Sequence, residues 1–124
     1  MARLMADYRR LSVTFRFRDG SSALDAPSLS NVALLAHALE AGEYDGRALL
    51  FVGFSDGQGE AGANRRLALK RARAVLAAVR DAAETLERSR AEMRAIAFGE
   101  ALPIACDDTP WGRQANRRVE VWLR

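Results

Sequence analysis

The chain has 124 residues, of which 49% are hydrophobic and 28% charged, and its formal net charge is +3. This length suits one domain with a single core, and the composition excludes an intrinsically disordered chain. A single cysteine and a single histidine exclude an internal disulfide and leave too few residues for most zinc sites or a catalytic triad.

The first half of the chain predicts a strand, a helix and a second strand. Apolar and polar residues alternate over 11–17, which predicts a strand with one buried face. Asp25 and Pro27 mark the start of a helix, and Gly42 ends it. Residues 47–52 are almost entirely apolar, which predicts a strand at the centre of a sheet.

The second half predicts one long helix and two further strands. A glycine-rich loop over 53–62 leads into a long helix with an apolar stripe, and this helix is predicted to end at about Ser89. A strand is predicted over 93–98 and, after a loop rich in turn residues, another over 117–123. Two helices and four strands predict an α+β fold, a two-layer sandwich with both helices on one face of the sheet. Polar alternation in the first and last strands predicts that the other face meets solvent.

The glycine-rich loop matches a dinucleotide-binding pattern only superficially. Gly57, Gly59 and Gly62 have the spacing G-x-G-x-x-G after a strand and before a helix. However, Asp56 and Glu60 would repel a pyrophosphate placed there. The acidic residues about 20 positions on, Asp81 and Glu84, fall inside the predicted long helix and not at the end of a strand, where one of them could hold a ribose. We therefore expect no dinucleotide and no other cofactor.

Residues for metal binding, catalysis or nucleic-acid binding do not form a convincing group. His37 lies within a helical pattern and is expected to be a partly exposed helix residue. Cys106 lies in a turn-rich loop without a histidine nearby, and Asp107-Asp108 is typical of a turn. The arginines are spread along the chain and do not alternate with aromatic residues, so no nucleic-acid partner is expected.

Two sequence blocks carry a more specific signal. The first is Gly53-Phe-Ser-Asp56-x-x-Gly59-x-x-x-x-Asn64-x-x-Leu67-Ala-x-x-Arg71-Ala72-x-x-Val75. The second is Gly99-Glu100-x-x-Pro103, followed by Thr109-x-x-Gly112-Arg113-x-x-Asn116-Arg117-Arg118-Val119-Glu120-Val121. Together they resemble the signature of OmpA-like domains, the family of the OmpA C-terminal domain, Pal and MotB. The resemblance covers about residues 11–123 and implies a β-α-β-α-β-β order with a mixed four-stranded sheet. The family usually has histidine, threonine and serine where this chain has Phe54, Ser55 and Ala68.

The first block brings together two opposite charges. Asp56 follows a strand and Arg71 lies in the next helix, 71 − 56 = 15 positions later, as in the family pattern. A carboxylate beside a guanidinium suits a zwitterion that carries an ammonium and a carboxylate on one carbon. The resemblance implies that this zwitterion is the diaminopimelate of Gram-negative peptidoglycan. Asp56 would then bind the ammonium, and Arg71 would bind the carboxylate bidentately.

Four further residues are candidates for the same site, each with a structural alternative. Ser55 keeps the hydroxyl of the family threonine, and Asn64 and Leu67 share a helix face with Arg71. Asn64 could instead belong to the helix start, and Leu67 to the packing. Arg117 could line the site or brace a loop. Asp56 and Arg71 are expected at the exposed mouth of the site, and Arg118 is expected to be solvated.

The resemblance implies a non-catalytic, non-covalent peptidoglycan binder that anchors an envelope protein to the cell wall. Residues 1–10 are expected to be an N-terminal extension or a cloning remnant, and 11–124 the domain. The N-terminus is too polar for a signal peptide. We therefore expect a periplasmic or envelope part of a longer exported protein, with any membrane contact made by its other regions. The oligomeric state stays open. The alternatives are an OmpA-like protein-interaction module that has lost wall binding, and a wall hydrolase.

Overall fold

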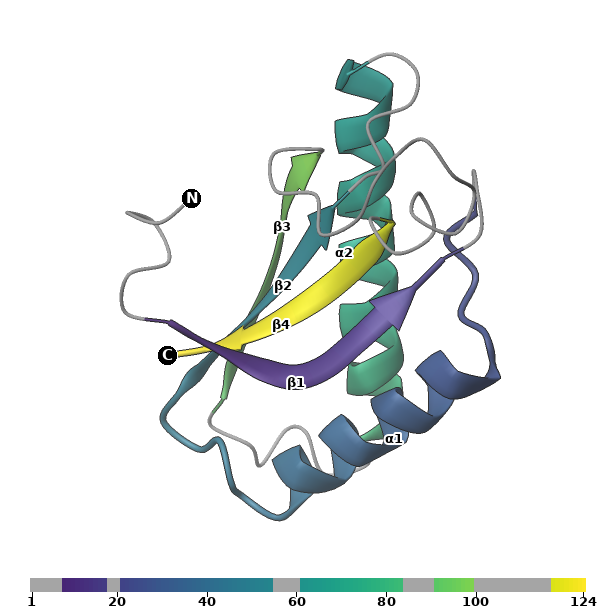
Figure 1. Ribbon diagram of the computed structural model, residues 1–124. Helices are drawn as coiled ribbons and strands as arrows, with labels where there is room; N and C mark the ends of the chain where they lie inside the picture. The colour runs from purple at the N-terminus through teal and green to yellow at the C-terminus, as the bar shows by residue number, and fades with distance from the viewer. Residues whose placement is uncertain (1–7, 18–20, 55–60, 84–90, 100–116) are drawn as a thin grey trace.

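Two helices and a four-stranded sheet make up the part of the chain that the computed structural model describes, residues 8–17, 21–54, 61–83, 91–99 and 117–124. The order of the elements is the predicted one (Figure 1). It runs β1 (Arg9–Arg16), α1 (Ala26–Glu40), β2 (Ala48–Phe54), α2 (Ala61–Ala82), β3 (Glu92–Gly99) and β4 (Arg118–Leu123).

The element boundaries differ from the sequence-based ones in two places. β1 begins two residues earlier than predicted, because its ladder with β4 extends back to the pair Arg9 and Leu123. The last two residues of the expected N-terminal extension therefore belong to the sheet. α2 ends at Ala82, and the predicted continuation over 84–89 lies outside the described residues. Neither described helix is long and apolar enough to cross a membrane.

The sheet is mixed, as predicted, with the strand order β1-β4-β2-β3. β4 runs antiparallel to both of its neighbours, while β2 and β3 are parallel. It follows that β1, β2 and β3 all run in one direction. Their C-terminal ends therefore share one edge of the sheet with the beginning of β4, and the candidate site belongs to this edge.

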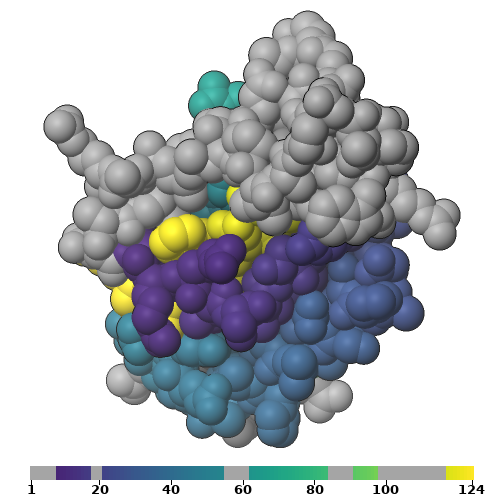
Figure 2. All heavy atoms as spheres, in the orientation of Figure 1, coloured from purple at the N-terminus to yellow at the C-terminus, as the bar shows by residue number. Residues whose placement is uncertain are grey.

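α1 begins and ends where the sequence predicts. The Asp25 carboxylate accepts a hydrogen bond from the Ser28 backbone N–H at 2.9 Å, and a proline occupies the first turn. Gly42, just beyond the helix, has a φ of 81°, a conformation that glycine adopts without strain. The Asn31 side chain donates to the Thr14 carbonyl oxygen at 3.0 Å and ties α1 to β1. The two elements lie side by side on the surface (Figure 2).

The main core lies between the helices and one face of the sheet. Both helices contribute to it, which confirms that they cover the same face. β2 is buried along both of its faces, which confirms its central position. The buried apolar residues of this core are Phe15, Phe17, Val32, Leu35, Leu39, Leu49, Phe51, Ala72, Val75, Val79, Val119, Val121 and Leu123.

The opposite face of the sheet is not simply solvated, which corrects the prediction from polar alternation. Leu50, Val52 and Phe54 of β2 form a second buried cluster there. On β4, Arg118 and Glu120 are also buried. They are polar but pair with each other, so their burial leaves no charge uncompensated. Exposed residues of β1, such as Arg10, Ser12 and Arg16, do fit the expected solvated face.

α2 packs against the end of β2 at backbone contact. A Cβ atom added to Gly53 would collide with the carbonyl oxygen of Ala68, so only glycine allows this approach. Ala68 itself is fully buried. The first half of α2 is therefore fixed against the C-terminal end of β2, next to the edge described above.

Candidate ligand-binding site

The proposed aspartate lies close to this edge by chain connectivity alone. Phe54 is the last residue of β2, and the segment 55–60 that carries Ser55 and Asp56 joins it to Ala61, the first residue of α2. Asp56 is two residues beyond Phe54 in the sequence, so it belongs to the segment that leaves the end of β2. Ser55 and Asp56 are outside the described residues, and so are Cys106, Asp107 and Asp108.

Arg71 lies about three turns into α2, on the side that faces the rest of the domain. Only 1% of its surface is exposed. Its Nε donates to the Ser21 carbonyl oxygen at 2.7 Å, and its Cζ lies 5.4 Å from the centre of the Phe17 ring. The expectation of an exposed arginine at the mouth of a site is therefore wrong, because the chain after β1 supplies both a carbonyl and an aromatic face for the guanidinium.

Phe17 connects Arg71 to the beginning of β4. Its backbone N–H donates to the Arg117 carbonyl oxygen at 3.2 Å, and the Arg117 Nε donates to the Phe17 carbonyl oxygen at 3.1 Å. Both residues are buried. Of the two roles left open for Arg117, this geometry favours bracing, since its side chain holds the end of β1 and thereby the ring beside Arg71.

Asn64 and Leu67 lie between the start of α2 and Arg71, and both are half-buried. Their spacing of i, i+3 and i+7 with Arg71 puts all three along one side of the helix. Asn64 lies inside the first turn of α2 rather than at the position before it. Both residues therefore lie along α2 between its first turn and Arg71.

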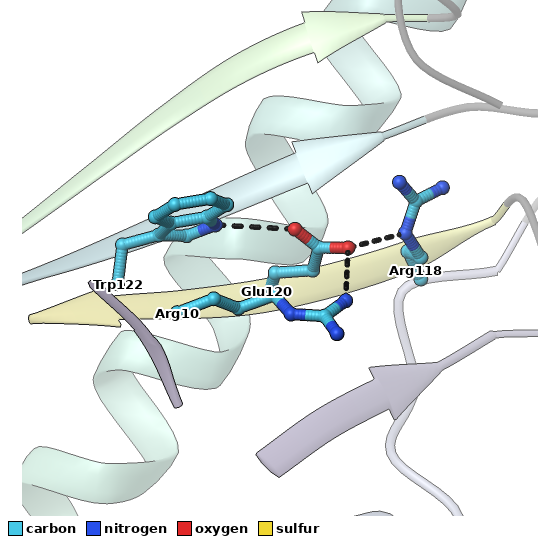
Figure 3. A network of polar contacts seen from close by, with 4 residues as sticks. All are labelled: Arg10, Arg118, Glu120 and Trp122. Carbon is cyan, nitrogen blue, oxygen red and sulfur yellow. Dashed lines mark hydrogen bonds and ion pairs between the residues drawn. The ribbon is translucent and has the colours of Figure 1, made fainter. Parts of the chain in front are cut away.

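Arg118 is buried, which corrects the expectation that it is solvated. Its Nε donates to Glu120 Oε2 at 2.8 Å, and its Cζ lies 4.0 Å from the centre of the Phe54 ring (Figure 3 shows the bond to Glu120). The contact with Phe54 is a cation–π interaction. Three arginines of this edge, Arg71, Arg117 and Arg118, are thus all buried, and each is held by a bond to another strand, loop or side chain.

The two apolar departures from the family pattern lie in the packing. Phe54 lies in the second buried cluster, and only 1% of its surface is exposed. Ala68 packs against Gly53 and is fully buried. Neither presents its side chain at the surface of the site.

Sequence reasoning missed Phe17 and Ser21 as parts of the Arg71 environment. The sequence predicts Phe17 only as part of a strand with one buried face, and it assigns Ser21 no role in the site. The signal that could have found Phe17 is its place at the end of a strand that closes the same sheet edge. For the Ser21 carbonyl there is no signal, because a backbone oxygen is the same for every residue type.

The structure confirms that His37 is an exposed residue of α1. Within the described ranges, no group of three His, Cys, Asp or Glu residues could hold a metal ion.

Residues 16–117 match the OmpA family, so the chain belongs to this family. A curated relative is the probable lipoprotein YiaD of Escherichia coli K12, which is 36% identical over 112 residues. That match covers 90% of this chain and 48% of the lipoprotein, so the chain spans about half of the relative's length.

Solved structures show the same fold. The peptidoglycan-associated lipoprotein of Burkholderia pseudomallei superposes with a TM-score of 0.76 at 22% identity, over 94% of this chain and 91% of that one. The C-terminal domain of Helicobacter pylori MotB gives 0.75 at 20% identity, over 90% and 84%. The cell wall anchor of the type VI secretion system of Pseudomonas aeruginosa gives 0.67 at 22% identity, over 98% and 94%.

Proposed function

We propose that this domain binds bacterial peptidoglycan non-covalently and tethers an envelope protein to the cell wall. Membership of the OmpA family supports this, as do the names of the relatives, a peptidoglycan-associated lipoprotein and a cell wall anchor. The same relatives support a place in the cell envelope. The observation that carries the proposal is the buried, pre-oriented Arg71, fifteen positions after Asp56 in the family block (71 − 56 = 15).

The ligand group is the zwitterionic end of diaminopimelate in the stem peptide. The bond from Nε to Ser21 and the contact with Phe17 orient the Arg71 guanidinium, and the planar fork of an arginine suits a carboxylate bidentately. Asp56 takes the ammonium. Ser55, Asn64 and Leu67 contact the ligand beside this pair, and Arg117 braces the Arg71 environment through Phe17. Pre-orientation matters because a guanidinium that is already ordered loses less entropy on binding.

Binding requires no catalytic group, so the domain acts mechanically. A single charge-recognition site of this kind is weak, and firm attachment to the wall comes from many such sites on one polymer. A hydrolase would instead release soluble fragments from labelled peptidoglycan, and we expect no such release.

Co-sedimentation with purified walls tests the proposal. The parent chain should sediment with diaminopimelate-type walls and not with lysine-type walls, because lysine lacks the carboxylate that Arg71 binds. Asp56→Ala should abolish sedimentation, since an unpaired ammonium in a partly desolvated site costs about 2–5 kcal/mol. Asp81→Ala, which removes an exposed carboxylate near the far end of α2, is the matched control and should bind as the parent does.

Equal binding to both wall types, or undiminished binding by Asp56→Ala, would contradict the proposed site. A chain that binds neither wall type would favour the second candidate, a protein-interaction module. The observation in its favour is that α1 exposes two large apolar side chains, Leu29 and Leu34.

A further inference from the structure

We propose that Arg118, held in place by Glu120, is a positioning residue for the ligand site. It would fix Phe54 at the end of β2 and thereby the segment that presents Asp56. This inference rests on the proposed function and assigns Arg118 a part in it. Arg118 itself touches no ligand, because its side chain lies on the outer face of the sheet, away from the face that α2 covers.

Glu120 holds the guanidinium of Arg118 by a network that uses both carboxylate oxygens (Figure 3). Oε2 accepts from Arg118 Nε at 2.8 Å and from Arg10 Nη1 at 3.4 Å, while Oε1 accepts from Trp122 Nε1 at 3.1 Å. The side chains of Arg118 and Glu120 are almost fully buried, whereas that of Arg10 is 54% exposed. The carboxylate therefore has one orientation, and the strong, short bond is the one to Arg118.

Arg118 meets Phe54 because of the strand register. β2 and β4 pair Gly53 with Val119, and the next residues along the two antiparallel strands are Phe54 and Arg118. The guanidinium carbon lies 4.0 Å from the centre of the Phe54 ring, within the range of a cation–π contact. Both side chains are buried, so this contact is made out of water, where it is strongest.

The end of β2 needs such a contact because its ladder with β3 is irregular there. β2 pairs regularly with β3 up to Gly53 and Ala97, and then shifts register so that Phe54 lies opposite Gly99. An irregularity of this kind disrupts the ladder and re-aims the strand. The contact between Arg118 and Phe54 therefore lies where the pairing of β2 with β3 is irregular, two residues before Asp56 in the sequence.

The experiment compares two arginines that pair with the same carboxylate oxygen. Arg118→Ala removes the one that contacts Phe54, and Arg10→Ala, the matched control, removes the one whose bond is longer and more exposed. Arg118→Lys keeps the charge but not the planar fork. Val79→Ala, a core substitution about two turns beyond Arg71, controls for general loss of stability.

Affinity for a soluble diaminopimelate-containing muropeptide is measured by calorimetry, at a temperature where every variant is folded. Amide hydrogen exchange is measured at Gly53 and Phe54, with Leu50 and Phe51 as references.

Arg118→Ala should weaken muropeptide binding roughly two- to thirtyfold, the range for residues that act on a site through others. It should also speed exchange at Gly53 and Phe54 relative to Leu50 and Phe51. Arg118→Lys should recover part of both effects, while Arg10→Ala and Val79→Ala should leave affinity and the exchange ratio at the parent values.

The outcomes separate this inference from the proposed function. If the parent binds, Asp56→Ala does not, and Arg118→Ala binds as the parent does, the positioning role is overturned and the proposed function stands. The positioning role is also overturned if Arg118→Ala affects binding only as much as Val79→Ala. If the parent binds no muropeptide, the proposed function fails and the positioning role in binding fails with it.

Discussion

At the scale of single residues, Arg71 has a structural role in addition to the binding role proposed for it. Its guanidinium is buried, bonded to the Ser21 carbonyl and packed on Phe17. Arg71→Ala should therefore abolish wall binding and also lower the free energy of unfolding by about 2 kcal/mol, because a buried acceptor loses a charged donor. Urea denaturation measures the second effect. Arg71→Lys should also lose most of the binding, since a point charge cannot reproduce the fork.

Arg73→Ala is the control for this pair of effects. Arg73 is an exposed arginine two positions further along the same helix, so its removal should change the unfolding free energy by less than about 0.5 kcal/mol and leave binding intact. An Arg71→Ala protein as stable as the parent would show that the contacts with Ser21 and Phe17 contribute nothing to the fold.

The sequence shows which residues belong to the family blocks, but it does not show how deeply their side chains are buried. The family blocks pair Asp56 with Arg71 in sequence, but both Arg71 and Arg118 were placed at the surface. Charged side chains are almost never fully buried without a partner. The partner of Arg71 is a backbone oxygen 50 positions away, which no local pattern reveals. The partner of Arg118 is only two positions away, but polar alternation in a strand is equally typical of a solvated face.

At the scale of elements, the contact between β2 and α2 depends on the absence of a side chain at one position. Gly53→Ala places a methyl group against the Ala68 carbonyl oxygen, a backbone atom that cannot rotate away. The substitution should lower the free energy of unfolding by about 1–3 kcal/mol or more, as overpacking does, and should weaken wall binding because the first half of α2 shifts. Urea denaturation and wall co-sedimentation measure the two effects.

Ala68→Gly should not rescue Gly53→Ala, since the colliding atom belongs to the backbone and remains. Gly46→Ala provides a comparison, because Gly46 has a φ of 75° and open space around it, so its cost is conformational strain alone. Recovery of stability in the double variant would mean that the collision is with a side chain and that helix and strand do not meet at backbone contact.

Elements with strong local signals were predicted well. The Asp25 cap, the proline in the first turn and the glycine after α1 each act within a few residues, so the sequence alone predicts α1 closely. The start of β1 was predicted two residues late, because its first pairs are made with the other end of the chain. The cover of the outer sheet face was missed for the same reason, since it depends on which side chains of β2, β3 and β4 meet there.

At the scale of the whole molecule, attachment should depend on the number of sites. Two copies of the domain joined by a flexible linker should bind insoluble wall about 10²–10⁴ times more tightly than one copy, because the second binding event is intramolecular. The same tandem should bind a soluble muropeptide monomer with unchanged affinity per site. Depletion of protein from solution by a wall titration measures the first quantity, and calorimetry the second.

A tandem in which one copy carries Asp56→Ala is the control and should return to the affinity of a single domain. If the intact tandem gains nothing over the single domain on insoluble wall, then the single site is already strong, and the weak, multivalent attachment proposed above is wrong.

The position of β4 has a consequence for the order of events during folding. β4 comes last of the four strands in the chain, yet it lies between β1 and β2, and its neighbour Arg117 bonds to Phe17 across 100 positions of sequence. A chain still emerging from the ribosome can form the β2–α2–β3 unit, but β1 has no strand to pair with until β4 is made. Contacts between such distant residues form slowly, since a long loop must close first. The Phe17 ring would thus reach its final place beside Arg71 only after β4 has inserted, so the proposed ligand site would be incomplete until the last strand has been synthesised.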